Sequence, residues 1–227
     1  MLRTLRVPAV VALTVLSASC ARGAPRQTEI LCDTWGVPHI YAEDTPSLFY
    51  AFGWAQMASH GDLLLRMYGE ARGRASEYWG EAHLDADRWL HTMDVPKRAQ
   101  VWYEAQPPEF RGYLDAFAAG INAYAGEHAD LIDDEVEVVL PVNGSDVLAH
   151  AQHAVHIAFY AGSWNPQVAQ QYLARGSNGW AIGPSRAADG NAMLLANPHL
   201  AWSGISLFYE AHLVAPGVDT YGGRSLP

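Results

Sequence analysis

The chain has 227 residues, of which 50% are hydrophobic and 17% are charged. This composition is typical of a globular protein and excludes disorder for most of the chain. The 24 acidic side chains outnumber the 14 lysines and arginines, which gives a formal net charge of -10. A chain of this charge repels polyphosphates, so we exclude a nucleic-acid partner.

Residues 1–23 predict an export signal. Two arginines precede an apolar stretch at residues 7–16, small residues follow it, and the stretch is too short to span a membrane permanently. Cys20 after the small residues is typical of a bacterial lipoprotein, although Leu16 lies one position too early for that motif. Lipidation at Cys20 and simple cleavage near residues 21–24 both stay open. Either outcome predicts a periplasmic or secreted protein, attached to a membrane only if it is lipidated.

The mature chain begins with a predicted β-hairpin. Residues 29–33 and 37–42 have an extended pattern, and a short turn separates them. If Cys20 is removed or lipidated, Cys32 has no disulfide partner, and we expect it to be a small buried side chain. His39 in the second segment is expected to be a structural histidine with satisfied hydrogen bonds.

Helices are expected next. Thr45 as the cap and Pro46 at the first helical position predict a helix that ends near His60. A second helical stretch covers residues 62–78. The clearest helix lies at residues 108–128, where apolar side chains recur at intervals of four and three residues and form one stripe.

An acidic stretch at residues 130–137 predicts a solvated loop, and a helix is expected over residues 145–160. His150, His153 and His156 lie on this helix at three-residue spacing. At that spacing they fan out around the helix instead of converging on one metal ion. We therefore expect exposed or core-edge histidines and no metal.

The pattern changes from helical to strand-like near residue 176. Three segments predict strands: residues 178–183, 192–197 and 205–214. Asp189 and Gly190 predict the turn between the first two of them, because Asp-Gly accepts the positive φ of a tight hairpin. We expect a mostly helical small-chain region at residues 24–176, which can end in a short spacer, and the start of a large chain at residues 177–227.

Ser177 is the candidate nucleophile. If the bond between Gly176 and Ser177 is cut, the serine gains a free α-amino group with a pKa of roughly 7.7–8.0. Nucleophile and base then occupy one residue. Gly176 has no Cβ, so it leaves the serine hydroxyl room to attack its carbonyl carbon. Gly-Ser-Asn alone is ordinarily a turn, so the wider sequence has to decide between the two interpretations.

That wider sequence resembles the nucleophile segment of the penicillin acylase family of N-terminal-nucleophile (Ntn) amidohydrolases. The segments that carry the resemblance are residues 177–184 (SNGWAIGP), 190–200 (GNAMLLANPHL), 29–41, 53–56 and 68–73. Two further segments resemble its cephalosporin (glutaryl-7-aminocephalosporanic acid) acylase branch, namely residues 114–124 and 209–214. The resemblance covers about residues 29–227.

The resemblance implies an α+β fold, in which a small helical chain and the first strands of an incomplete αββα sandwich fold together. It implies an exported precursor that cleaves itself before Ser177 and then hydrolyses the linear amide of an acylated amine, such as a penicillin or cephalosporin side chain. Ser177 would attack the amide, and His199 would position or activate the serine. The family's oxyanion donors lie further along than residue 227. The implied partners are a small-molecule amide and the remainder of the large chain.

The resemblance also implies a substrate pocket and no cofactor. Tyr160, Leu200 and Tyr209 match residues that line the acyl pocket, with Phe208 as a rival to Tyr209 because of a one-residue slip in the alignment. Asn143 aligns with an acidic calcium ligand of penicillin G acylases, so calcium binding stays open.

Two departures from the family pattern concern the acyl group. The arginine that helps to hold a glutaryl carboxylate is absent from residues 161–166, and an expected glutamine is Ser225. A buried carboxylate without a bidentate partner is unfavourable, so these departures argue against a glutaryl side chain.

Two other functions stay open. An acyl-homoserine-lactone acylase also carries Asn-Pro-His after the serine strand, and a truncated, non-catalytic remnant would have no activity at all. We further predict that this 227-residue piece alone is inactive and aggregation-prone. A strand at residues 205–214 without later sheet neighbours would leave an open edge.

Overall fold

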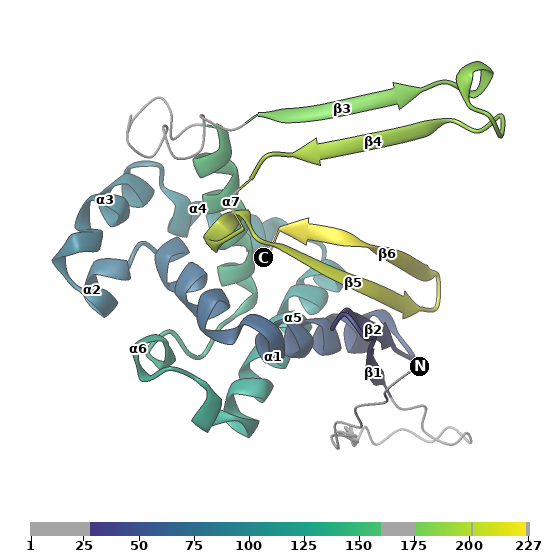
Figure 1. Cartoon of the computed structure of the whole chain (residues 1–227). Helices are drawn as coiled ribbons and strands as arrows, with labels where there is room; N and C mark the ends of the chain where they lie inside the picture. Colours follow the sequence, from purple (N-terminus) through teal and green to yellow (C-terminus); the bar gives the residue numbers. More distant parts are fainter. Residues whose placement is uncertain (1–27, 160–175, 201, 226–227) are drawn as a thin grey trace, which may run out of the picture.

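The computed structural model describes residues 28–159, 176–200 and 202–225 (Figure 1). Helices and two separate sheets make up this part, so the α+β class is confirmed. The sequence predictions for the export signal, for Cys20 and for Tyr160 lie outside the described residues. None of the helices in this part of the chain is long and apolar enough to cross a membrane.

The helices form one body. They are α1 (Thr45–Ala71), α2 (Ala75–Trp79), α3 (Leu84–Thr92), α4 (Val95–Ala105), α5 (Pro108–Glu127), α6 (Asp134–Glu137) and α7 (Gly144–Phe159). Single 3-10 turns lie at Glu81–His83, Ala129–Leu131, Pro184–Arg186 and Gly204–Ser206. The amphipathic helix expected at residues 108–128 is α5, and the helix expected at residues 145–160 is α7.

Helix α1 joins the two helices that the sequence separates. The expected break is present as a kink, because His60 has non-helical angles (φ -144, ψ 36). The cap assignment was wrong by one residue. Asp44, and not Thr45, caps the helix, and its carboxylate accepts a hydrogen bond from the backbone N–H of Ser47 at 2.7 Å. Pro46 then lies in the first turn, where its missing N–H costs nothing.

Helices α1 and α5 cross with their backbones in contact. A Cβ on Gly53 would overlap the carbonyl oxygen of Phe117, and a Cβ on Gly120 would overlap that of Tyr50. Only glycine permits this approach, and it brings the apolar stripe of α5 onto α1. The buried core that results includes Phe52, Met57, Leu64, Leu65, Tyr68, Phe117 and Ile121.

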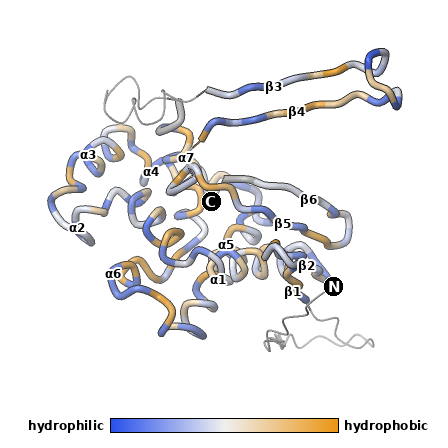
Figure 2. Tube along the Cα trace, viewed as in Figure 1, coloured by the Kyte–Doolittle hydropathy of each residue, from blue (hydrophilic) through white to orange (hydrophobic). Residues whose placement is uncertain are grey.

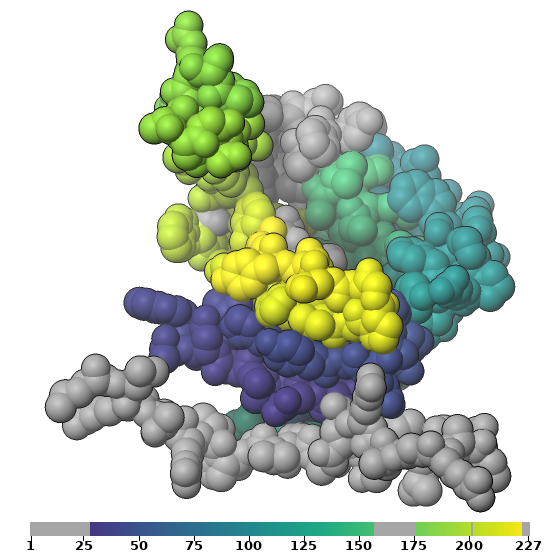
Figure 3. Space-filling view, turned by 90° about the vertical axis from the view of Figure 1, so that its right-hand side faces the viewer, coloured from purple at the N-terminus to yellow at the C-terminus, as the bar shows by residue number. Residues whose placement is uncertain are grey.

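A four-stranded sheet packs against this body. Its strands are β1 (Glu29–Cys32), β2 (Pro38–Tyr41), β5 (Phe208–Ala215) and β6 (Val218–Ser225), in the order β1-β2-β5-β6. Strands β1 and β2 form the expected hairpin, and β2 pairs in parallel with β5. The space-filling view shows the C-terminal strands lying on the N-terminal segments (Figure 3).

The prediction of an open edge at residues 205–214 was wrong. Strand β5 lies inside the sheet, because β2 pairs with one side of it and β6 with the other. Strand β6 escapes prediction because Gly222 and Gly223 depress its strand propensity. The edges of the sheet are therefore β1 and β6.

The second sheet is a hairpin of β3 (Ser177–Ile182) and β4 (Met193–Pro198) that projects from the body (Figure 1). Gly190 has the positive φ (74°) that the Asp-Gly turn predicts. Every residue of both strands is exposed, although apolar residues occur along both strands (Figure 2). The hairpin thus presents apolar surface that nothing in the described chain covers.

Three burial expectations were wrong. The acidic stretch at residues 130–137 is not simply a loop, because it contains α6, whose Val136 is buried in the core. His150 and His153 are buried, since α7 packs against α1, α4 and α5. Cys32, at the end of the edge strand β1, is exposed.

Candidate active site

The β3–β4 hairpin brings Gly176, Ser177 and His199 together. Ser177 pairs with Pro198, so the next residue on each strand, Gly176 and His199, also lie opposite each other. The backbone N–H of His199 donates a hydrogen bond to the carbonyl oxygen of Gly176 at 2.9 Å. That carbonyl belongs to the peptide bond between Gly176 and Ser177. A hydrogen-bond donor is therefore already in place on the bond whose cleavage would free the serine.

The imidazole of His199 faces the same bond from one side. Its Nε2 lies 3.2 Å from Nδ2 of Asn178, and its Nδ1 lies 3.6 Å from the position of a Cβ on Gly176. An amide N–H of Asn178 donates to Nε2, which leaves the proton of a neutral ring on Nδ1. Successive side chains of a strand point to opposite faces, so the Ser177 hydroxyl points away from the face that Gly176 and Asn178 share with the ring.

This geometry divides the roles within the site. The backbone N–H of His199 donates to the Gly176 carbonyl oxygen, whereas its ring contacts Asn178. If the bond between Gly176 and Ser177 is cut, the freed α-amino group of Ser177 supplies a base within reach of its own hydroxyl. Asn178 and the His199 backbone N–H were missed by sequence reasoning, which considered only the imidazole. The strand register, with Asn178 opposite Asn197, is the signal that points to them.

Tyr209, one of the expected pocket residues, lies in the buried core. Tyr209 is 4% exposed and packs on α1, with its ring 5.9 Å from the rings of Phe52 and His60. Its hydroxyl lies 3.5 Å from Oγ of Ser59. Burial raises the pKa of Tyr209 to about 12. This tyrosine is a neutral part of the core at ordinary pH.

The rival residue and the last pocket residue lie on the surface. Phe208 is exposed, because alternation along β5 turns it to the face opposite Tyr209. Leu200 directly follows His199 and is also exposed. Leu200 is thus the one described pocket candidate that lies beside the β3–β4 hairpin.

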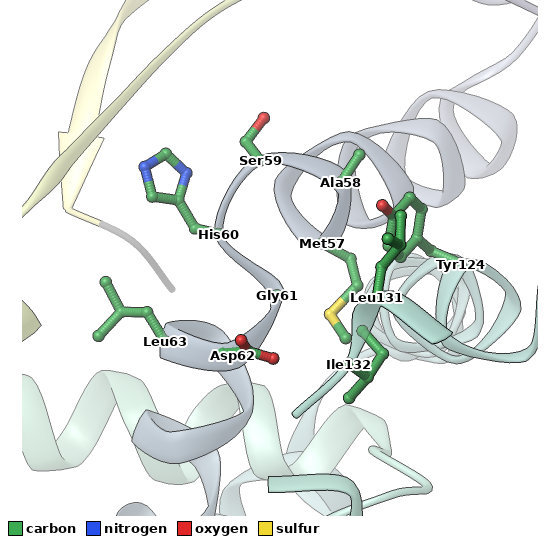
Figure 4. A pocket seen from close by; sticks show the side chains of 10 residues that line it. All are labelled: Met57, Ala58, Ser59, His60, Gly61, Asp62, Leu63, Tyr124, Leu131 and Ile132. Carbon is green, nitrogen blue, oxygen red and sulfur yellow. The ribbon is translucent and has the colours of Figure 1, made fainter. Parts of the chain in front are cut away.

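A cavity of about 280 Å³ lies at the α1 break, and its lining does not include Ser177. In Figure 4, Met57, Tyr124 and Ile132 gather on one side of the break, whereas the ring of His60 points away from them. Burial lowers the pKa of His60. The residues that line this cavity include no member of the Ser177 site.

Asn143 does not fit the role of an acidic calcium ligand. Its side-chain oxygen accepts hydrogen bonds from the backbone N–H of Ser145, from the hydroxyl of Ser145 and from the backbone N–H of Asp146, at 2.9, 2.7 and 3.2 Å. The residue therefore caps α7, and its oxygen has no lone pair left for an ion. Among the residues that the structure describes, no group of three or more histidine, cysteine or acidic side chains is arranged to hold a metal.

The fold and the β3–β4 hairpin are consistent with an Ntn-hydrolase-type protein, and sequence comparison assigns the family. The penicillin amidase family model matches residues 27–226. The chain therefore belongs to the penicillin amidase family.

Its relatives are acylases of greater length. The chain is 30% identical over 229 residues to the acyl-homoserine lactone acylase PvdQ of Pseudomonas fluorescens, which covers 85% of this chain and 29% of that protein. It is 28% identical over 255 residues to PvdQ of Pseudomonas savastanoi pv. phaseolicola, covering 95% of this chain and 32% of that protein. The chain thus spans about a third of the length of these relatives.

A solved structure agrees on the fold. The thermostable penicillin G acylase of Alcaligenes faecalis superposes with a TM-score of 0.52 at 22% identity, covering 65% of this chain and 79% of that chain. At this identity the likeness concerns the fold alone.

Proposed function

We propose that the chain is the N-terminal part of an exported amidohydrolase precursor that cuts itself between Gly176 and Ser177 and then hydrolyses an N-acyl amine. The observation that carries the proposal is the hydrogen bond from the His199 backbone N–H to the Gly176 carbonyl oxygen. Family membership supports the same reaction class. The chain spans only about a third of its relatives, so the activity of the whole protein belongs to the proposal.

Self-cleavage follows from the residues around this bond. The Ser177 hydroxyl oxygen attacks the Gly176 carbonyl carbon, and the His199 N–H stabilises the negative charge that develops on the carbonyl oxygen. Such a donor contributes roughly 3–4 kcal/mol in comparable sites. The C–N bond then breaks, the α-amino nitrogen of Ser177 takes the proton, and an ester links the two residues. Water hydrolyses the ester and leaves a carboxylate on Gly176 and a free amine on Ser177.

Amide hydrolysis uses the products of that cut. The free α-amino group removes the proton of the Ser177 hydroxyl, which attacks the substrate carbonyl. The amine leaves with the proton, and water releases the acyl group from the serine. The donors for this second oxyanion come from the remainder of the large chain, since the described hairpin directs the His199 N–H at Gly176. We propose no cofactor for either step.

An N-acyl-homoserine lactone is the substrate class that we favour. The matched relatives carry that name, and the chain lacks the arginine that a glutaryl carboxylate needs. A penicillin or cephalosporin side-chain amide is the second candidate, because residues 114–124 and 209–214 resemble the cephalosporin branch. A non-catalytic remnant is the third.

The test uses the full-length product of the gene. We expect Ser177→Ala to abolish cleavage, whereas Ser185→Ala, an exposed serine in the same hairpin, should leave it unchanged. Intact mass and N-terminal sequencing of the processed wild type should give a chain that begins Ser-Asn-Gly-Trp. Cleavage that persists in the Ser177 variant would contradict self-processing.

Turnover separates the substrate classes. Liquid chromatography of long-chain acyl-homoserine lactones and of glutaryl-7-aminocephalosporanic acid, each incubated with processed enzyme, should show release of the fatty acid only. Release of glutarate would favour the cephalosporin candidate. If neither substrate is hydrolysed, the result would favour the non-catalytic remnant. Periplasmic or secreted location, with membrane attachment only if Cys20 is lipidated, is proposed from the leader. Fractionation of cells that express wild type and Cys20→Ser tests it.

A further inference from the structure

His39 and His212 form a pair that the proposed reaction does not use. They lie directly opposite each other on the parallel strands β2 and β5. The Nδ1 atoms of the two rings are 3.0 Å apart, and the rings meet edge to face. Both side chains are about a quarter exposed, at 28% and 22%, so solvent and small ions reach them.

A carboxylate lies beside the far nitrogen of each ring. Nε2 of His212 is 3.1 Å from Oδ1 of Asp219, and Nε2 of His39 is 3.8 Å from Oδ2 of Asp33. The other oxygen of Asp33 accepts the backbone N–H groups of Trp35 and Val37 at 2.8 and 3.0 Å, which fixes the carboxylate in place.

Asp219 selects the protonated nitrogen of the His212 ring, whereas Asp33 lies beyond hydrogen-bond distance of His39. A carboxylate beside Nε2 favours the proton there and leaves a lone pair on Nδ1, as it does for histidines that ligate metals. The Nδ1 lone pair of His212 then accepts a hydrogen bond from Nδ1–H of His39 at 3.0 Å. If the proton of His39 moves to its Nε2, on the side of Asp33, both Nδ1 lone pairs become free to bind one metal ion.

We propose that His39 and His212 bind a divalent transition-metal ion of the zinc class through Nδ1. Tetrahedral zinc at about 2.0–2.1 Å from each nitrogen places the two nitrogens about 3.3 Å apart, so the rings need to separate by only a few tenths of an ångström. Water completes the coordination, because the described chain supplies no third ligand there. Asp219 orients His212 from behind, and Asp33 lies behind His39.

The position of the site in the chain gives it a role. His39 precedes Ser177 and His212 follows it, so the metal would tie together the two chains that self-cleavage produces. This role rests on the proposed function, whereas metal binding itself does not.

Binding is tested on the uncleaved, full-length Ser177→Ala protein. Calorimetric titration with Zn²⁺ at neutral pH should show one ion per chain. We expect His39→Gln and His212→Gln each to weaken binding at least tenfold, and Asp219→Asn to weaken it about tenfold. His83→Gln, a histidine on the helical body, is the matched control and should bind as before. Circular dichroism verifies that each variant is folded.

Two outcomes would overturn the proposal. Absence of saturable Zn²⁺ binding would mean that only a proton lies between the rings, and equal binding by the double variant His39→Gln/His212→Gln would place the ion elsewhere. The link between the two chains is tested separately on the cleaved wild-type protein. Zn²⁺ should raise the urea concentration at which its two chains separate. In the cleaved double variant Zn²⁺ should leave that concentration unchanged. If cleavage fails, the proposed function fails, and the titration of the uncleaved protein still decides the site.

Discussion

Arg72 is the residue that fastens the helical body most firmly. Its guanidinium donates to both carboxylate oxygens of Asp146, at 2.8 and 2.7 Å, and to the carbonyl oxygens of Val139 and Pro141. The hydroxyl of Tyr78 accepts a fifth bond. Burial opposes the charge, but the bonds to Asp146 outweigh it and raise the pKa of Arg72 above its ordinary value. The end of α1 is thereby fixed to the start of α7.

Removing the carboxylate should leave a buried cation without its partner. We expect Asp146→Asn to lower the free energy of unfolding by about 3–5 kcal/mol. Asp85→Asn is the matched control, because its pair with Arg88 is exposed and such pairs contribute about 0–1 kcal/mol. Urea denaturation of both variants measures the difference, and equal shifts would contradict the assigned role of Arg72.

His153 should make stability depend on pH. Burial, with His150 and His156 nearby, lowers the pKa of His153 from 6.5 to about 3. Between these two pH values the unfolded chain binds a proton at this histidine and the folded chain does not. The free energy of unfolding is therefore not reduced by this residue above pH 6.5, and it falls as the pH drops toward 3. From pH 7 to pH 5 the loss is about 2 kcal/mol. Urea midpoints at both pH values should show a smaller loss in His153→Asn, and an equal loss would refute the prediction.

Local sequence was a good guide to some residues and a poor guide to others. Ser177, Gly176 and His199 lie close together because of one short hairpin, so their proximity could be predicted from the sequence. The burial of His153 and the exposure of Cys32 depend on which distant elements pack beside them. No local pattern carries that information.

At the scale of elements, the crossing of α1 and α5 rests on glycine. We expect Gly120→Ala to destabilise the protein by about 3 kcal/mol or more, because the new methyl group meets the backbone of Tyr50, which cannot move aside as a side chain can. Gly112→Ala on the same helix meets nothing within 4 Å and should stabilise it by about 0.5–1 kcal/mol. Thermal or urea unfolding checks both, and similar effects would show that the close crossing is dispensable.

Elements with a strong period were predictable, and those defined by long-range pairing were not. The apolar stripe of α5 and the break near His60 are both visible in the sequence. Strand β6 is not, since its pairing with β5 and not its own composition makes it a strand. The parallel pairing of β2 with β5 joins residues more than 170 positions apart, which no local period indicates.

At the scale of the whole molecule, the β3–β4 hairpin leaves apolar side chains in water. Leu194 is 78% exposed and Trp202, just after β4, is 94% exposed. Such patches mark surfaces that another part of a protein covers. We therefore keep the prediction that the 227-residue piece alone associates and lacks turnover, but we assign the cause to this hairpin and not to β5.

Light scattering after size-exclusion chromatography, with a fluorescent probe of apolar surface, measures this association. Expression together with the remaining part of the gene product should suppress it and restore turnover. A soluble monomer of the piece that hydrolyses amides would contradict the prediction. The sequence alone did not predict that the hairpin projects from the helical body, because its position depends on contacts between different elements.

The parallel pairing of β2 with β5 has a consequence for the proposed cleavage. Before the cut, the two strands belong to one molecule, and pairing them costs only the entropy of closing a long loop, which grows slowly with its length. After the cut, the same pairing becomes the meeting of two separate molecules, and its cost depends on their concentration. If the proposed cut takes place, the topology favours one order of events: the chain folds first as a single molecule, and the cleaved protein keeps a structure that its two separated chains would regain far less readily.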